Sequence, residues 1–284
     1  MKNIKYFFQF LIIMILFSIY RIIGLKYSSI LSAQIFKLFG PLFRSSNIGH
    51  RNLITAFPKL NKFQRNEILK GMWINYGKIF AEYLFIKDIK NSENLIIENQ
   101  EILEILKKES KPVIFVSGHF NNFELMAMHI EKSGIDLAAI YRPLNNKFLN
   151  PIMERIRKKY ICKKQIKKGI SGTKQLLKEF KKGSSIALMI DQRVSEGIMC
   201  NFFGRKAYTT TIPAQFIKKF NAAVVPIYIE RLADDNFKLK ILDSIKFSSD
   251  DSIDKITLEL NSILEKMILT NPEQWIWTHN RWKI

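Results

Sequence analysis

The spacing of apolar residues divides the chain into two regions. From residue 28 to 90, apolar residues recur every three or four positions, as in LNKFQRNEILKGMWINYGKIFAEYLFI, and this spacing predicts amphipathic helices. Beyond residue 110, short apolar runs with the length of strands alternate with helix-like segments. The strand-like runs are KPVIFVS, IDLAAIY, SSIALMI, AAVVPIYIE and FKLKIL. The helix-like segments cover residues 122–132, 146–159, 171–182, 211–220 and 252–268.

Strands that alternate with helices predict an α/β fold, with a largely parallel, mixed sheet flanked by helices. The sequence contains no internal repeat, no low-complexity tract and no long linker rich in Pro, Gly and Ser. We therefore expect one domain over residues 27–284, of which residues 27–95 form a helical N-terminal part.

The first 26 residues have the pattern of a membrane anchor. Lys2 and Lys5 precede a charge-free run from Tyr6 to Tyr20, and Arg21 follows it. A spanning helix needs about 20 apolar residues, so the run suffices if Arg21 reaches back to the interface. No small-residue cleavage site follows, which favours an uncleaved transmembrane anchor over residues 1–26. A signal peptide and a buried core helix are the alternatives.

The charge balance indicates an anionic partner. The chain has 45 Lys and Arg against 25 Asp and Glu, a net charge of +20. Such a chain attracts anionic lipid, an acidic protein or nucleic acid. The segment 155–182 alone holds twelve basic residues and one acidic residue. Its few aromatics, Tyr160 and Phe180, are too sparse to stack bases, so we expect no nucleic-acid partner. The basic residues also favour a body on the cytoplasmic side of the membrane.

Several common catalytic signatures are absent from the sequence. It contains no G-x-x-x-x-G-K-[ST], G-x-G-x-x-G, H-E-x-x-H or G-x-S-x-G motif. Its two cysteines, Cys162 and Cys200, form no metal-binding spacing with histidine. We therefore expect no cofactor and no metal.

One histidine lies where an α/β sheet places functional groups. His119 follows the strand-like run VIFVS, and such groups gather at the carboxyl ends of strands. Asn121 or Asn122 could cap the following helix, and Glu124 falls in its first turn. The Glu124 carboxylate could hold one imidazole nitrogen and leave the other free as a base. The alternative is a helix-capping glutamate beside a histidine that only ends a strand.

Three further residues follow strand-like runs in the same way. Arg142 comes after IDLAAIY, and its guanidinium suits a phosphate or a developing oxyanion, or else a salt bridge at the sheet edge. Asp191 comes after SSIALMI, where a turn aspartate is also common. Arg193 is a candidate for the same phosphate-facing rim as Arg142.

The segment SGHFNNFE resembles the H-x-x-x-x-[DE] box of the glycerolipid acyltransferase superfamily. More specifically, the chain resembles the bacterial lipid A biosynthesis late acyltransferases, the lauroyl/myristoyl transferases. Five further segments resemble the family in its own order: HRNLITAFPKL, AIYRPLNN, IALMIDQR, NFFGRKAYTTTIPAQFIKKFNAAVVPIYIER and NPEQWIWTHNRWK. The resemblance extends from about residue 45 to the end. Pro213 and Asn221 stand where many members carry glycine, which puts in doubt the shape of the loops near the acyl site.

This resemblance implies a membrane-bound O-acyltransferase. Its donor would be a fatty acyl chain on acyl carrier protein, and its acceptor a hydroxyl of a Kdo-bearing lipid A precursor, in lipopolysaccharide biosynthesis. The resemblance places the enzyme at the bacterial inner membrane with its catalytic domain on the cytoplasmic side. His119, held by Glu124, would deprotonate the acceptor hydroxyl, and Asp191 would have a role in the active site.

Two other functions remain open from the sequence. The first is acylation of another polar lipid, such as a lysophospholipid or a glycosylated phosphoinositide. The second is a non-catalytic, basic membrane-binding protein. Three of the four tryptophans lie in WIWTHNRW, which interfacial anchoring and core packing explain equally well.

Overall fold

The computed structural model describes residues 2–43 and 45–283 and begins with a helical region. Its helices are α1 (Lys2–Phe39), α2 (Ser45–Ala56), α3 (Lys62–Glu82) and α4 (Ile86–Asn91), with short 3-10 turns at Gly40–Leu42 and Tyr83–Phe85. The helix α3 starts at a capping box, because Asn61 and Gln64 each bond the other's backbone N–H. The prediction of helices over residues 28–90 is confirmed.

The remainder of the chain builds a seven-stranded sheet. The strand order is β1 (Leu95–Glu98), β9 (Phe237–Ile241), β8 (Val224–Arg231), β2 (Ile114–Ser117), β5 (Ser185–Met189), β3 (Leu137–Tyr141) and β4 (Lys164–Lys167). Neighbouring strands run parallel except β8 and β9. The expected α/β fold with a largely parallel, mixed sheet is confirmed, and all five predicted strands are present.

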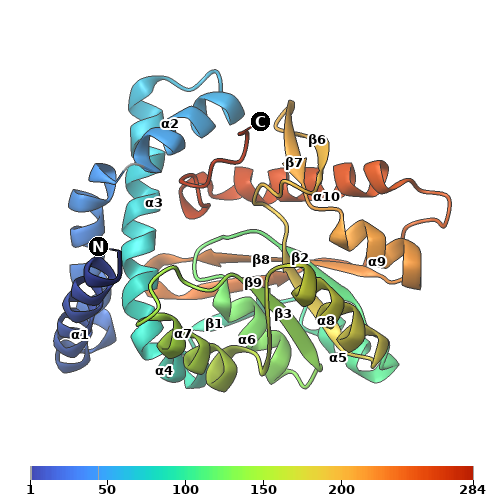
Figure 1. The fold of residues 1–284 in the computed structure, drawn as a ribbon, viewed down its shortest axis with the longest axis horizontal. Helices are drawn as coiled ribbons and strands as arrows, with labels where there is room; N and C mark the ends of the chain where they lie inside the picture. Colours follow the sequence, from blue (N-terminus) through green and yellow to red (C-terminus); the bar gives the residue numbers. More distant parts are fainter. Residues whose placement is uncertain (1, 44, 284) are drawn as a thin grey trace.

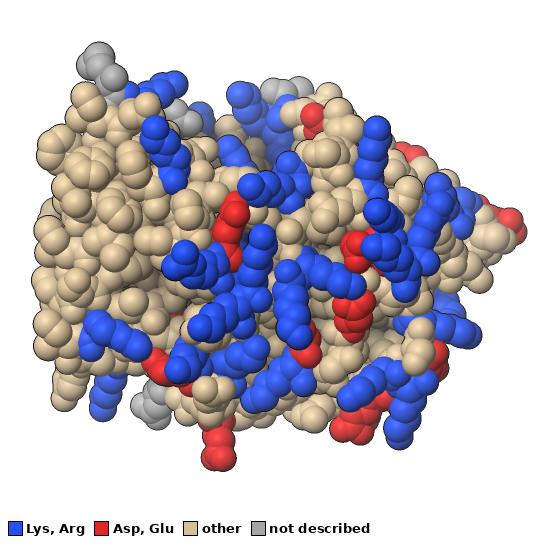
Figure 2. Space-filling view, turned by 60° about the horizontal axis from the view of Figure 1, so that its bottom comes forward, with Lys and Arg blue, Asp and Glu red and all other residues tan. Residues whose placement is uncertain are grey.

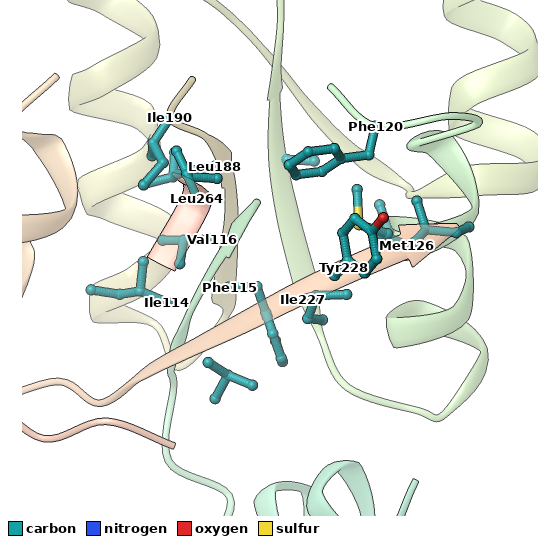
Figure 3. Packing of buried hydrophobic residues seen from close by; sticks show 14 of the residues in the cluster. Ile114, Phe115, Val116, Phe120, Met126, Leu188, Ile190, Ile227, Tyr228 and Leu264 are labelled. Carbon is teal, nitrogen blue, oxygen red and sulfur yellow. The ribbon is translucent and has the colours of Figure 1, made fainter. Parts of the chain in front are cut away.

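Helices cover both faces of this sheet (Figure 1). One face carries α5 (Glu101–Glu109), α6 (Glu124–Lys132), α7 (Asn150–Ile156) and α8 (Ile170–Lys181), and α7 continues into a π-helical turn over Arg157–Ile161. The other face carries α9 (Ile212–Phe220) and α10 (Ile253–Thr270), beside the hairpin β6 (Ile198–Phe202) and β7 (Arg205–Thr209). The strand β2 therefore has all four residues buried. Figure 3 shows Ile114 and Val116 on one side of β2 and Phe115 on the other.

The long helix α1 contains a kink at Gly24, where φ is 77°. Beyond the kink, α1 packs closely on α3, since the Ser32 hydroxyl donates to the Gly77 carbonyl at 2.6 Å. A Cβ at Gly77 would lie 2.4 Å from the Ser32 carbonyl oxygen, so only glycine fits this crossing. By length and composition α1 could cross a membrane, and its most apolar window has a mean hydropathy of 2.1.

Candidate active site

The ends of two neighbouring strands bring His119 and Asp191 together. In the parallel pair β2–β5, Ser117 lies beside Met189. His119 and Asp191 each come two residues after this pair, so both chains leave the sheet at the same edge. His119 Nδ1 lies 2.8 Å from Asp191 Oδ1, which makes the two side chains a hydrogen-bonded pair.

Asp191 is fully buried and is surrounded by donors. Its Oδ2 accepts the backbone N–H of His119 at 2.7 Å and the indole N–H of Trp275 at 2.8 Å. Burial by itself would raise the pKa of Asp191, but His119 and Trp275 lower it to about 2. The carboxylate is therefore ionised at neutral pH.

An ionised carboxylate can only accept hydrogen bonds, and this sets the tautomer of neutral His119. The proton must sit on Nδ1, which faces Asp191, and Nε2 is left with its lone pair. The His119 side chain is 21% exposed, so the imidazole remains accessible. The ring contacts Phe123 edge-on at a centroid distance of 4.9 Å, which limits its rotation. This arrangement suits a general base.

The prediction that Glu124 contacts His119 is wrong. Glu124 does lie in the first turn of α6, but its carboxylate accepts from Arg157 Nε at 2.8 Å and Nη2 at 2.5 Å. The Tyr83 hydroxyl also donates to it. The first turn of α6 directs this side chain towards the 3-10 turn at Tyr83–Phe85 and the π-helical turn. Asp191 is therefore the residue that holds the imidazole.

The Glu124–Arg157 pair is an almost buried ion pair, with 7% and 12% of the two side chains exposed. Burial lowers the pKa of Arg157, but Glu124 and Tyr83 more than offset this, so the guanidinium stays charged. Burial and Glu124 together raise the pKa of Tyr83, which keeps its hydroxyl as a donor. Sequence reasoning missed Arg157, because it lies within a run of exposed basic residues.

A cavity of about 650 Å³ opens beside His119. Three residues predicted from the sequence, His119, Glu124 and Arg142, line this cavity. Arg157 lines it as well. Lys168 adds another cation to its wall. The apolar part of the wall comprises Phe123, Ala127, Ala139, Ile140, Ile170, Ala187, Leu188, Met189, Val194 and Ile212.

Small residues create this space. Ala139 on β3 lies beside Ala187 on β5, and Ala127 on α6 lines the same cavity. Sheet positions that face a helix are commonly filled by larger apolar side chains, and in the same row of this sheet Phe115 follows Ala187. The alanines therefore leave an apolar compartment next to the His119–Asp191 pair.

Among the described residues that line the cavity, Arg193 is absent. Its guanidinium donates to the Lys283 carbonyl at 2.6 Å and to the Ser195 hydroxyl at 3.0 Å. The expectation that Arg193 faces the same rim as Arg142 is therefore wrong. Its backbone N–H donates to His279 Nε2 at 2.9 Å, and burial lowers the pKa of His279 to about 4, so this imidazole stays neutral.

The loop between β2 and α6 is supported from behind. Asn121 has a φ of 43°, and its side-chain amide donates to Gln274 at 2.8 Å. The Asn122 amide donates to Glu82 at 2.8 Å, and Glu82 is paired with Arg231. Neither asparagine caps α6, because both side chains are used to hold the loop that carries His119.

Two of the three tryptophans in the C-terminal segment are buried in the core. Trp275 and Trp277 are at most 1% exposed, which favours core packing over interfacial anchoring for both. Nearby, the fully buried Arg281 donates to the Tyr208 carbonyl and the Thr209 hydroxyl. The segment thus closes over the site and supplies one of the three donors to Asp191.

Pro213 and Asn221, which stand where many members of the resembled family carry glycine, are compatible with the local backbone. Pro213 lies in the first turn of α9, where a missing N–H has no cost. Asn221 ends α9 in the left-handed region, with φ 50°, which asparagine tolerates better than most residues.

A histidine–carboxylate pair at the edge of an apolar cavity, on a largely parallel α/β fold, is typical of an enzyme that uses general acid–base catalysis. Comparison with known proteins identifies the class of enzyme. The sequence matches the bacterial lipid A biosynthesis acyltransferase family over residues 1–284, and the chain belongs to this family. It is therefore an acyltransferase.

Curated relatives agree with this assignment. The chain is 24% identical over 253 residues to the lipid A biosynthesis palmitoleoyltransferase of Escherichia coli (strain K12), covering 85% of this chain and 80% of that protein. It is equally identical to the lipid A biosynthesis lauroyltransferase of the same strain, covering 84% and 79%. A crystal structure of the 1-acyl-sn-glycerophosphate acyltransferase from Thermotoga maritima matches 86% of this chain and 97% of that one, with 13% identity and a TM-score of 0.43.

Proposed function

We propose that the chain transfers a fatty acyl group from acyl carrier protein to a hydroxyl of a Kdo-bearing lipid A precursor at the cytoplasmic face of the bacterial inner membrane. The observation that carries the reaction is the His119–Asp191 pair at the edge of an apolar cavity. Membership of the lipid A family supports the acceptor class. We further propose residues 27–284 as one acyltransferase domain.

His119 is the general base in this proposal. Nε2 takes the proton of the acceptor hydroxyl as that oxygen attacks the thioester carbonyl. The C–S bond breaks as the tetrahedral intermediate collapses, and the imidazolium returns its proton to the leaving thiolate. Asp191 stabilises the imidazolium by charge while it exists, and holds the ring in place throughout.

Glu124 and Arg142 have positioning and binding roles. Glu124 fixes Arg157 on the cavity wall, so its effect on catalysis is indirect. Arg142 is exposed and lines the cavity, where it could bind a phosphate of the acceptor. Lys168, on the same wall, would reinforce that charge.

The basic face supports a carrier protein as the acyl donor. Figure 2 shows Lys and Arg crowding the side of the molecule that carries α6, α7 and α8. Lys174, Lys178 and Lys181 are exposed and repeat every three or four residues along α8. Because α8 begins at Ile170 on the cavity wall, this charged row leads away from the cavity. An acidic carrier bound there would deliver its thioester arm to His119.

The first prediction concerns the proton transfer. We expect His119→Ala to lower turnover by roughly 100- to 10,000-fold, the usual contribution of a positioned base. Asp191→Asn should cost a similar factor, because an amide cannot stabilise imidazolium by charge. Glu124→Gln should cost less than either. The assay uses purified protein, acyl carrier thioesters and lipid A precursors, with products measured by mass spectrometry.

Thermal unfolding of the same preparations is the control for folding. A His119→Ala protein that melts early yet keeps its activity per folded molecule would refute the catalytic role. Acyl transfer to lysophospholipid in preference to the lipid A precursor would favour the other acceptor class. Binding to anionic vesicles without any acyl transfer would favour the non-catalytic alternative.

The second prediction concerns the apolar compartment. Ala139→Val should shift chain-length preference towards shorter acyl groups, because the added methyl groups occupy space beside Ala187. At about 0.8 kcal/mol per excluded methylene, a chain two carbons too long should lose roughly tenfold in a competition between two donors. The control is Ala138→Val, on the opposite face of β3. The product ratio does not depend on the active fraction, and an unchanged ratio for Ala139→Val would place the acyl chain elsewhere.

The third prediction concerns the donor. Reversing Lys174, Lys178 and Lys181 to glutamate should raise KM for the acyl carrier protein substrate and leave kcat nearly unchanged, with the largest effect at low salt. The matched control reverses Lys59, Lys62 and Lys266, which are exposed outside α8. Equal KM changes in both triple variants would show that only net charge matters, and not this face.

A further inference from the structure

The first half of α1 has two distinct faces. One is a row of exposed apolar side chains separated by three or four residues, and their exposed fractions run from 44% at Ile19 to 85% at Ile22. The members of this exposed apolar row are Ile4, Phe8, Ile12, Ile15, Ile19 and Ile22. In Figure 2 the end of the molecule formed by α1, on the left, shows few charges.

The opposite face of α1 packs against the protein along its length. Near the N-terminus, the Asn146 amide donates to the Tyr6 carbonyl at 2.8 Å, and the Phe10 ring lies 6.0 Å from that of Phe148. Further along, Phe17 lies 5.1 Å from Phe80 on α3, and Tyr20 is fully buried. The helix therefore runs alongside the domain and does not project from it.

These contacts restrict how α1 can lie in a bilayer. Tyr6 and Tyr20 are 14 residues apart, or about 21 Å along a helix. If α1 stood upright in a hydrocarbon core of about 30 Å, the 146–148 loop would enter the membrane with it. That loop carries the exposed Lys147, whose ammonium lies 5.3 Å from the Phe148 ring centroid. A lysine deep in lipid is costly, so an upright helix would have to break these contacts.

We infer that residues 2–23 of α1 lie in the plane of the membrane surface, with the exposed apolar row in the acyl region and the protein on the other side. This arrangement keeps every contact with Asn146, Phe148 and Phe80 and leaves Lys147 at the level of the head groups. It replaces the spanning orientation expected from length and composition. The inference rests on the contacts of α1 and is independent of the proposed reaction.

Lipid is the occupant that fits this face. The run from Tyr6 to Tyr20 contains no charge, and large apolar side chains are exposed in one continuous row from Ile4 to Ile22. A contiguous apolar surface of this kind is typical of a contact with a membrane or another protein. Lys2, Lys5, Arg21 and Lys26 flank the run and suit anionic head groups.

The in-plane helix also has a consequence for the cavity. Arg142 lines the cavity, and four residues later Asn146 is bonded to α1. One short loop therefore connects the cavity wall to the membrane-bound helix. This connection holds the cavity near the lipid surface, where an amphipathic acceptor resides.

The test measures depth along the helix. Ile4→Cys, Ile12→Cys and Ile19→Cys are labelled singly with a fluorophore, since the native Cys162 and Cys200 are buried. The full chain is bound to vesicles of phosphatidylethanolamine and phosphatidylglycerol, and quenching by spin labels at two acyl positions gives each depth. Leu258→Cys, exposed on α10, is the control away from α1.

The in-plane arrangement predicts that all three labels lie at one depth, within about 5 Å of each other, near the boundary of head groups and acyl chains. The control label should not be quenched. A spanning helix would instead separate Ile4 and Ile19 by about 22 Å, with Ile12 nearest the bilayer centre. That result would overturn the inference, and so would unquenched labels with a doubled molecular mass, because a second copy would then cover the row.

Discussion

The structure is organised around one buried charge, the carboxylate of Asp191. A carboxylate without access to water is stable only when donors surround it, and Asp191 has three: the backbone N–H and the Nδ1 of His119, and the indole of Trp275. The two residues that supply these donors are placed by different requirements of the fold. The parallel pairing of β2 and β5 aligns His119, while the C-terminal segment must close over the sheet to bring Trp275. Satisfying Asp191 therefore also fixes the tautomer of the imidazole.

Two separate polar networks surround Asp191 and His119, and they have different roles. Glu82, Arg231 and the two asparagines hold the His119 loop from behind, away from the cavity. The Glu124–Arg157 pair lies on the cavity side. Its guanidinium is charged, but the Glu124 carboxylate balances that charge, so the pair as a whole is neutral. The H-x-x-x-x-E spacing thus places its two residues on one cavity, although the glutamate bonds the arginine and the histidine bonds the aspartate.

Much of this could be predicted from the sequence. The five apolar strands, their helices and the strand-end positions of His119, Arg142 and Asp191 followed from periodicity alone. The strand β4 was missed because KQIK is mostly polar, and β1 because LIIE is short. The partner of His119 was assigned wrongly, because spacing within a segment shows only local contacts. The register of β2 with β5 links residues 72 positions apart and is visible only in the folded sheet.

The central claim is that Asp191, and not Glu124, orients the imidazole of His119. Nitrogen-15 NMR of histidine-labelled protein at neutral pH tests it directly, with His119→Gln to assign the signals. We expect a protonated Nδ1 and an unprotonated Nε2, with a hydrogen-bonded Nδ1 proton that disappears in Asp191→Asn and persists in Glu124→Gln. A proton on Nε2 in the neutral ring, or an Nδ1 proton lost only in Glu124→Gln, would contradict the account.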